Sequence, residues 1–318
     1  MQKVKAWISA ARLRTLPLSI SGIIVGTSLG NFQVSNALQE VYDADHGTIC
    51  FAFSSVWRSP IFWLAILVTI GFQVLSNFAN DYGDGVKGTD ANREGEKRMV
   101  ASGVITPSQM KVGMIITGLI TLFLASLLIF IAFGNEHFIL AFIFFNLAIA
   151  AIIAAVKYTV GTNAYGYSGF GDVFVYLFFG LLSVLGSYFM FVKSLELELL
   201  LPATAIGLFS VAVLNLNNMR DIYNDAKVGK NTLVVKFGMK KAKRYHYALI
   251  VIGMVSAIAY TLLNYHSPYQ FIYTVAFIPL LLNCIKVSKN SEPRLLDSEL
   301  KKVALSTFAF AILFAFLN

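Results

Sequence analysis

The chain has 318 residues, of which 57% are hydrophobic and only 13% charged, and its formal net charge is +8. Soluble domains carry roughly 25% charged residues, so this composition excludes an ordinary soluble protein. Apolar runs of about 20 residues recur along the chain, which favours a polytopic α-helical membrane protein over a β-barrel. The two cysteines, Cys50 and Cys284, lack the spacing of a zinc site or a disulfide framework.

The apolar runs predict an all-α fold of nine membrane-spanning helices in one membrane-embedded domain, residues 1–318. An amphipathic segment, 1–13, precedes them. The predicted spans are 15–33, 60–80, 110–133, 137–156, 172–192, 197–217, 246–264, 269–286 and 301–317. The predicted connections include a polar loop with aromatic residues at 34–59, long polar loops at 82–107 and 219–246, and a loop rich in glycine and tyrosine at 157–171.

Nine spans place successive loops on alternate sides of the membrane. All of the 25 lysines and arginines except Arg58 and Lys193 then fall on one side. Because short loops rich in Lys and Arg stay in the cytoplasm, this side is predicted to be cytoplasmic, with the N-terminus there and the C-terminus outside. We therefore expect a multi-pass protein of the cell inner (cytoplasmic) membrane. The asymmetry explains the net charge without a nucleic-acid partner, and the sequence identifies no protein partner.

Two acidic stretches, 77–88 and 217–225, stand at the cytoplasmic ends of predicted spans. Asp81 and Asp84 are three residues apart and Asp221 and Asp225 are four apart, so each pair shares a helix face. A lone aspartate there would simply be solvated, but two clusters on one membrane side favour function. Each stretch ends an apolar helix and leads into a basic loop, a weak internal repeat that would bring the two clusters together in a central cavity open to the cytoplasm.

The chemistry of these carboxylates predicts a metal site. Facing carboxylate pairs repel unless a cation lies between them, and an all-oxygen set suits Mg²⁺, which accepts one or two carboxylates plus substrate phosphates. We expect Asp81, Asp84, Asp221 and Asp225 to act as catalytic residues that hold Mg²⁺ and a diphosphate at the membrane surface.

Polar and basic neighbours of the two stretches are candidates for substrate binding. Cations around a diphosphate stabilise its binding and its departure, and Arg220, beside Asp221, is the strongest catalytic candidate among them. Arg12 and Arg14 could contact an anion at a helix N-terminus or anchor the membrane surface. Each base alone could merely follow the positive-inside rule, and each asparagine could cap a helix. The candidates are Asn77, Asn80, Lys87, Arg98, Asn217, Lys227 and Lys230.

The loop at 157–171 and its flanks supply a third group of candidates. Its aromatic faces could hold a flat polar ring or a carbocation. The simpler alternative is an interfacial aromatic belt. The residues concerned are Lys157, Tyr158, Tyr165 and Tyr167, together with Asp172, which either orients a substrate or caps a helix.

The motifs Asn80-Asp81-x-x-Asp84 and Asp221-x-x-x-Asp225 resemble the two aspartate-rich motifs of the UbiA superfamily of intramembrane prenyltransferases, and the resemblance covers nearly the whole chain. Residues 80–88, 157–161, 165–167 and 218–221 are similar to the branch that prenylates 1,4-dihydroxy-2-naphthoate in menaquinone biosynthesis. The first superfamily motif usually contains a third aspartate, and here Gly88 takes that position, as that branch tolerates. Whether Asp90 substitutes for it is open.

The resemblance implies transfer of a polyprenyl group from polyprenyl diphosphate to 1,4-dihydroxy-2-naphthoate, with loss of CO₂ and diphosphate, to give demethylmenaquinol. It implies Mg²⁺ held by the four aspartates, assisted by Arg220, Lys227 and Lys230, and a prenyl tail within the bilayer. Alternatives are another acceptor, such as 4-hydroxybenzoate, haem, chlorophyllide or a glycerol phosphate, or a cation-coupled transporter that uses facing acidic clusters. The compact motif of CDP-alcohol phosphotransferases is not seen.

Overall fold

The structure, a computed structural model, describes residues 2–46, 56–88, 98–161 and 164–317. Within these ranges the chain forms helices and turns and no strands, which confirms the predicted all-α class. Cys50 and Asp90 lie outside the described residues.

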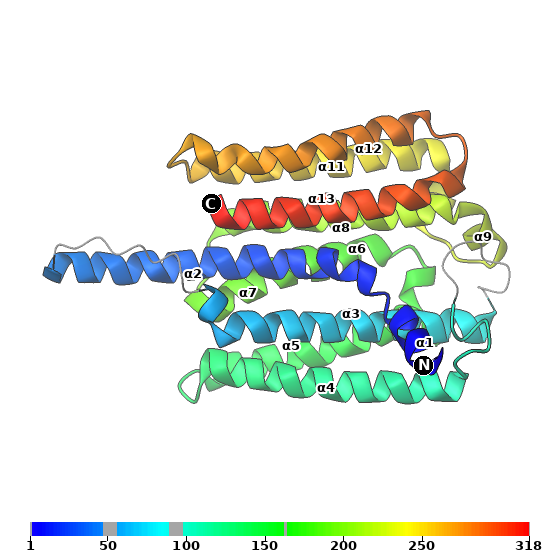
Figure 1. Ribbon diagram of the computed structural model, residues 1–318, viewed down its shortest axis with the longest axis horizontal. Helices are drawn as coiled ribbons and strands as arrows, with labels where there is room; N and C mark the ends of the chain where they lie inside the picture. Colours follow the sequence, from blue (N-terminus) through cyan, green and yellow to red (C-terminus); the bar gives the residue numbers. More distant parts are fainter. Residues whose placement is uncertain (1, 47–55, 89–97, 162–163, 318) are drawn as a thin grey trace.

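The long helices lie side by side in one bundle (Figure 1). A π-helical stretch, Tyr176–Leu182, joins α6 to α7, and a 3₁₀ stretch, Pro268–Ala276, leads into α12. The helices are α1 Gln2–Ala11, α2 Leu16–His46, α3 Pro60–Lys87, α4 Pro107–Phe133, α5 Phe138–Lys157, α6 Gly171–Val175, α7 Ser183–Val192, α8 Leu200–Arg220, α9 Ile222–Lys227, α10 Leu233–Phe237, α11 Met239–Leu263, α12 Phe277–Lys289 and α13 Asp297–Leu317.

Eight helical runs among the described residues are long and apolar enough to cross a membrane, and they coincide with the first eight predicted spans. The ninth predicted span lies in α13, a helix of 21 residues whose first turns carry Asp297, Glu299 and two lysines. Figure 1 shows α1, α9 and the end of α3 gathered at one end of the bundle and the C-terminus at the other. The first acidic stretch forms the C-terminal end of α3, and the second forms the end of α8 and the start of α9. Both stretches therefore lie at the same end of the bundle, as predicted.

Two helices extend further than the hydropathy pattern predicts. The predicted loop 34–59 begins inside α2, which continues to His46, and α3 continues past residue 80 to Lys87. Hydropathy marks where a helix leaves the apolar phase and not where its hydrogen bonds stop. Helix α3 ends only at Gly88, whose left-handed φ of 70° and N–H bonds to the carbonyls of Asp84 and Gly85 form the cap. The first acidic stretch is thus helical almost throughout.

Two helices set the position of the site within the bundle. Helix α8, which carries the second acidic stretch, is central, and its Phe209, Leu216 and Met219 are fully buried. Helix α2 crosses the π-helical stretch and α7 at very short range through glycines spaced four apart. A Cβ at Gly22 would lie 2.8 Å from the Phe179 carbonyl oxygen, and one at Gly30 would lie 3.0 Å from that of Tyr188. Such close approach of two helix backbones requires small residues.

Candidate active site

A cavity of about 590 Å³ runs inside the bundle and reaches the end that carries both acidic stretches. Its lining divides into a charged end and an apolar body. The charged end includes Arg12, Arg14, Asn77, Asn80, Asp84, Arg98, Asn217, Arg220, Lys230 and Asp297. The apolar body includes Ala65, Val68, Phe72, Leu128, Ile129, Phe144, Leu147 and Met190. This division fits a ligand with an anionic head and a hydrocarbon tail.

In the first acidic stretch, Asn80 and Asp84 share the face of α3 that lines the cavity. Asp84 is buried, and its Oδ1 accepts a hydrogen bond of 2.6 Å from the Tyr167 hydroxyl. Arg98 Nη2 lies 3.8 Å from the other oxygen of Asp84. The Asn80 side-chain oxygen accepts a bond from the Thr159 hydroxyl at 3.1 Å. The carboxylate and the amide are therefore held in fixed positions at the cavity wall.

Asp81, in the same stretch, was expected to face a ligand, but the structure places its side chain away from the cavity. It is 1% exposed and is not among the residues that line the cavity. Its Oδ1 accepts the backbone N–H of Val100 at 2.9 Å and its Oδ2 that of Met99 at 3.0 Å. Successive helical residues point about 100° apart, so a neighbour of Asn80 can face another segment of the chain.

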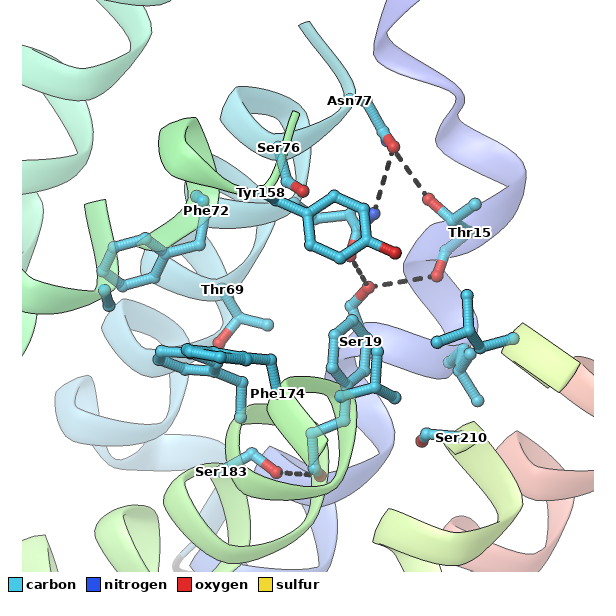
Figure 2. Close-up of a pocket in the computed structure, with 18 of the residues that line it drawn as sticks. Thr15, Ser19, Thr69, Phe72, Ser76, Asn77, Tyr158, Phe174, Ser183 and Ser210 are labelled. Carbon is cyan, nitrogen blue, oxygen red and sulfur yellow. Dashed lines mark hydrogen bonds between the residues drawn. The ribbon is translucent and has the colours of Figure 1, made fainter. Parts of the chain in front are cut away.

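Asn77 borders the cavity through a network that joins α2 to α3 (Figure 2). Its Nδ2 donates to the Ala11 carbonyl at 2.8 Å and lies 3.3 Å from the Thr15 hydroxyl. Gln73 Nε2 donates to Asn77 Oδ1, and the Ser19 hydroxyl donates to Gln73 Oε1 at 2.6 Å. Ser19 and Gln73 line the cavity but gave no sequence signal, because single polar residues within apolar runs match no motif.

In the second acidic stretch, the Arg220 guanidinium gathers three oxygen-bearing side chains. It donates from Nε and Nη2 to the two oxygens of Asp221, each at 2.8 Å, and from Nη2 to Asn217 Oδ1 at 2.7 Å. Its Nη1 donates to Asp297 Oδ1 at 2.6 Å, which ties α8 to the start of α13. Asp225 is buried, and its Oδ1 lies 3.8 Å from Lys230 Nζ. Asp297 lines the cavity and was missed by sequence reasoning, because it is distant from either motif.

Tyr167 connects the two acidic stretches. Its hydroxyl bonds Asp84, while Lys87 Nζ lies 4.0 Å and Lys230 Nζ 5.7 Å from the centre of its ring. Its carbonyl accepts the N–H of Asn231 at 2.9 Å, just after the second stretch. Lysines near an aromatic face are attracted by its quadrupole. The loop rich in glycine and tyrosine is therefore a structural bridge between the two halves of the site.

Aromatic rings form the wall beyond the charged end. Tyr165 stacks on Phe174 with ring centres 3.9 Å apart and meets Tyr158 edge-on at 5.3 Å. Figure 2 shows Tyr158, Phe72 and Phe174 around the same space. Burial raises the pKa of both tyrosine hydroxyls, and the negative charge of Asp172 raises that of Tyr158 further. Both hydroxyls thus stay protonated and neutral at physiological pH.

Five predicted binding residues do not line the cavity: they are Lys87, Lys157, Tyr167, Asp172 and Lys227. Lys157 and Lys227 are exposed at helix ends on the side predicted to be cytoplasmic, where the positive-inside rule alone would account for basic residues. Asp172 is buried in the first turn of α6. Lys87 and Tyr167 instead adjoin the lining through the contacts given above, as do the predicted metal ligands Asp221 and Asp225.

The donor set suits Mg²⁺ shared with a phosphate better than a closed protein cage. No three His, Cys, Asp or Glu side chains of the described ranges converge on one metal-binding point. Mg²⁺ is usually bound through one or two carboxylates plus substrate phosphates and waters. Asn80, Asp84 and Asn217, which line the cavity, and the neighbouring Asp225 supply hard oxygen donors of this kind, with cations close by for the phosphates.

Comparison with known proteins gives a consistent picture. The UbiA prenyltransferase family matches residues 46–316. The chain is 37% identical to a Haemophilus influenzae protein and 38% identical to an Escherichia coli protein, both named 1,4-dihydroxy-2-naphthoate octaprenyltransferase; the alignments cover 99% and 98% of this chain and 96% of each relative. A UbiA homologue from Archaeoglobus fulgidus, solved with GPP and Mg²⁺, shares the fold with a TM-score of 0.64 at 13% identity, covering 97% of this chain and 99% of that one.

Proposed function

This chain belongs to the UbiA prenyltransferase family, and from that premise we propose that it transfers a polyprenyl group from polyprenyl diphosphate to 1,4-dihydroxy-2-naphthoate. Diphosphate and CO₂ leave, and the product is demethylmenaquinol, in menaquinone biosynthesis. The observation that carries the proposal is the cavity itself, with a charged end, an aromatic wall and an apolar body in sequence. The names of the full-length relatives support the choice of acceptor.

The charged end binds the diphosphate and stabilises it as a leaving group. When the C–O bond breaks, negative charge develops on the diphosphate, and fixed cations at that position lower the barrier. Arg98, Arg220 and Lys230 line the cavity there. Asn80, Asp84, Asn217 and Asp225 would hold Mg²⁺, with Asp221 as a further candidate; when bound, the metal ion neutralises phosphate charge.

The aromatic wall receives the reacting carbon and the acceptor. Loss of diphosphate leaves an allylic cation, which the faces of Tyr158, Tyr165 and Phe174 stabilise by their quadrupoles. The neutral tyrosine hydroxyls cannot capture the cation as phenolates. The apolar walls exclude water, which would otherwise quench it before the naphthoate ring attacks.

The apolar body holds the prenyl tail, whose remainder extends into the bilayer. Both tail and product are lipids, so a multi-pass protein of the cytoplasmic membrane follows, acting as one membrane-embedded domain. The distribution of Lys and Arg supports a cytoplasmic N-terminus and site and an external C-terminus. The bundle agrees with this topology, because α1 and the two acidic stretches share the end opposite the C-terminus (Figure 1).

The test uses purified protein in detergent with a long-chain prenyl diphosphate and 1,4-dihydroxy-2-naphthoate, with Mg²⁺ or with EDTA, and measures prenylated product, CO₂ and diphosphate. We expect product and CO₂ in equal amounts with Mg²⁺ and none with EDTA. Diphosphate release that depends on another acceptor, such as 4-hydroxybenzoate, would overturn the assigned acceptor. No turnover by folded protein with any acceptor would overturn the enzyme class.

A further inference from the structure

Residues 98–105 form a compact turn packed on the acidic end of α3. Ser102 N–H donates to the Arg98 carbonyl at 3.1 Å, and Ile105 N–H donates to that of Met99 at 3.1 Å. Met99, Val100 and Ile105 are buried in one cluster with residues of α1, α3 and α4. The turn is therefore part of the packed core at this end of the bundle and not a loose connection.

Asp81 anchors this turn through both of its oxygens. The backbone N–H groups of Met99 and Val100 donate to one carboxylate, at 3.0 and 2.9 Å, and the carboxylate is 1% exposed. Hydrogen bonds to an ionised acceptor are roughly twice as strong as neutral ones. Two successive amides on one buried carboxylate thus fix the position of the backbone at residue 99.

Helix α3 contacts the same turn at a second residue, Gly85, one helical turn after Asp81. A Cβ at Gly85 would lie 2.6 Å from Val100 Cγ1 and 3.3 Å from the Ala101 backbone nitrogen. No real Cβ tolerates the first of these distances. Gly85 therefore leaves room for the same backbone segment, 99–101, that the Asp81 carboxylate holds by hydrogen bonds.

These contacts fix the position of Arg98, which directly precedes the two hydrogen-bonded residues, Met99 and Val100. Its side chain is 8% exposed and lines the cavity, and its Nη2 lies 3.8 Å from Asp84 Oδ2. We propose that Asp81 is a positioning residue: it holds the backbone of Met99 and Val100 so that Arg98 enters the charged end of the cavity, and it does not serve as a metal ligand. Only the further statement that Arg98 binds diphosphate rests on the proposed function.

Amide hydrogen exchange of the detergent-solubilised protein tests the anchor without any substrate. Asp81→Asn loses the charge and keeps one acceptor oxygen, so exchange in a peptide that covers 98–103 should become about tenfold faster or more. Asp84→Asn, on the same helix, is the matched control and should leave that peptide protected. Unchanged exchange in Asp81→Asn would overturn the proposal.

Binding of inorganic diphosphate with Mg²⁺ tests the action through Arg98. Asp81→Asn and Arg98→Gln should weaken binding by similar factors, and the double variant should bind no more weakly than Arg98→Gln. Gly85→Ala, which alters no carboxylate, should reproduce the Asp81→Asn defect by displacing Val100. The Mg²⁺ concentration for half-maximal binding should stay unchanged in all three single variants.

Two results would overturn this part of the proposal. Effects of Asp81→Asn and Arg98→Gln that multiply would show that Asp81 does not act through Arg98, and a shift of the Mg²⁺ midpoint confined to Asp81→Asn would make it a ligand. If wild-type protein bound no diphosphate, the proposed function would fail, while hydrogen exchange would still decide whether Asp81 anchors the turn.

Discussion

The two acidic regions sit at the same end of the bundle, but their carboxylates are held by different chemistry. In the first region, neutral groups from distant segments donate hydrogen bonds to the carboxylates, the backbone N–H groups of Met99 and Val100 to Asp81 and the Tyr167 hydroxyl to Asp84, while Arg98 Nη2 lies 3.8 Å from Asp84. In the second region, a cation from the neighbouring position, Arg220, donates hydrogen bonds to both oxygens of Asp221, and Lys230 Nζ lies 3.8 Å from Asp225.

The first region is therefore preformed for ligand binding, whereas in the second region a ligand must replace a contact that Arg220 and Asp221 already make with each other. A carboxylate that accepts bonds from neutral groups keeps its negative charge available to a metal ion. A carboxylate paired with an arginine is already neutralised, so a metal ion or phosphate must compete with that pair. We therefore expect substitutions in the first region to lower the rate of prenyl transfer, and those around Arg220 to change mainly the affinity for the substrate.

The largest expected effect is that of Asp84→Asn. Asp84 lines the cavity, and loss of its charge should lower kcat by roughly 10²–10³-fold, the scale found when one preorganised electrostatic group is removed from an active site. Prenyl-transfer rates at saturating substrate measure this effect. Glu136→Gln, at an exposed carboxyl in the turn between α4 and α5, is the matched control and should leave the rate unchanged. An equal loss in both variants would show that the assay reports general damage.

An intermediate effect is expected for Tyr167→Phe, which keeps the ring between the two lysines and removes only the hydroxyl on Asp84. A hydrogen bond to a charged group is worth about 1.5–3 kcal/mol, so kcat/KM should fall roughly tenfold or more. Tyr165→Phe serves as control, because that hydroxyl bonds a neutral carbonyl, of Ala154, at 2.8 Å. A smaller loss for Tyr167→Phe than for Tyr165→Phe would remove the proposed contrast between the regions.

The smallest effect is expected for Asp297→Asn, at the edge of the second region. Its side chain is 53% exposed, and exposed ion pairs are worth about 0.2–1 kcal/mol, so KM for the prenyl diphosphate should change by no more than about fivefold. Asp221→Asn, at the partner of the same guanidinium whose side chain is only 10% exposed, should change KM more. The reverse order would mean that Asp297, and not Asp221, governs how Arg220 meets the substrate.

Sequence reasoning located the membrane spans and both acidic stretches because both leave local signals. Apolar length defines a span, and i, i+3 and i, i+4 spacing places Asp84 and Asp225 on helical faces. A cavity reaches the shared end of α3 and α8, and nine of the predicted site residues line it. They are Asn77, Asn80, Asp84, Arg98, Tyr158, Tyr165, Asn217, Arg220 and Lys230.

The rest depended on tertiary contacts that no local pattern encodes. The direction of Asp81 follows from the turn at 98–100, and the role of Asp297 follows from the packing of α13 on α8. Lys157 and Lys227 are basic residues close in sequence to the predicted site, but they do not line the cavity. A lysine near a motif cannot be assigned to a ligand by sequence alone when the positive-inside rule already predicts bases on that side of the membrane.

The glycine crossing of α2 over α7 has a consequence for the width of the hydrocarbon channel. Ser183 and Ser187, which face these glycines, also line the cavity, so this part of the wall is made of two touching backbones. A wall built from side chains can widen when a rotamer changes, whereas this one can widen only if a whole helix moves. The position of the cavity wall at Ser183 and Ser187 is thus fixed by helix packing, and prenyl tails of different length must be accommodated at other parts of the wall.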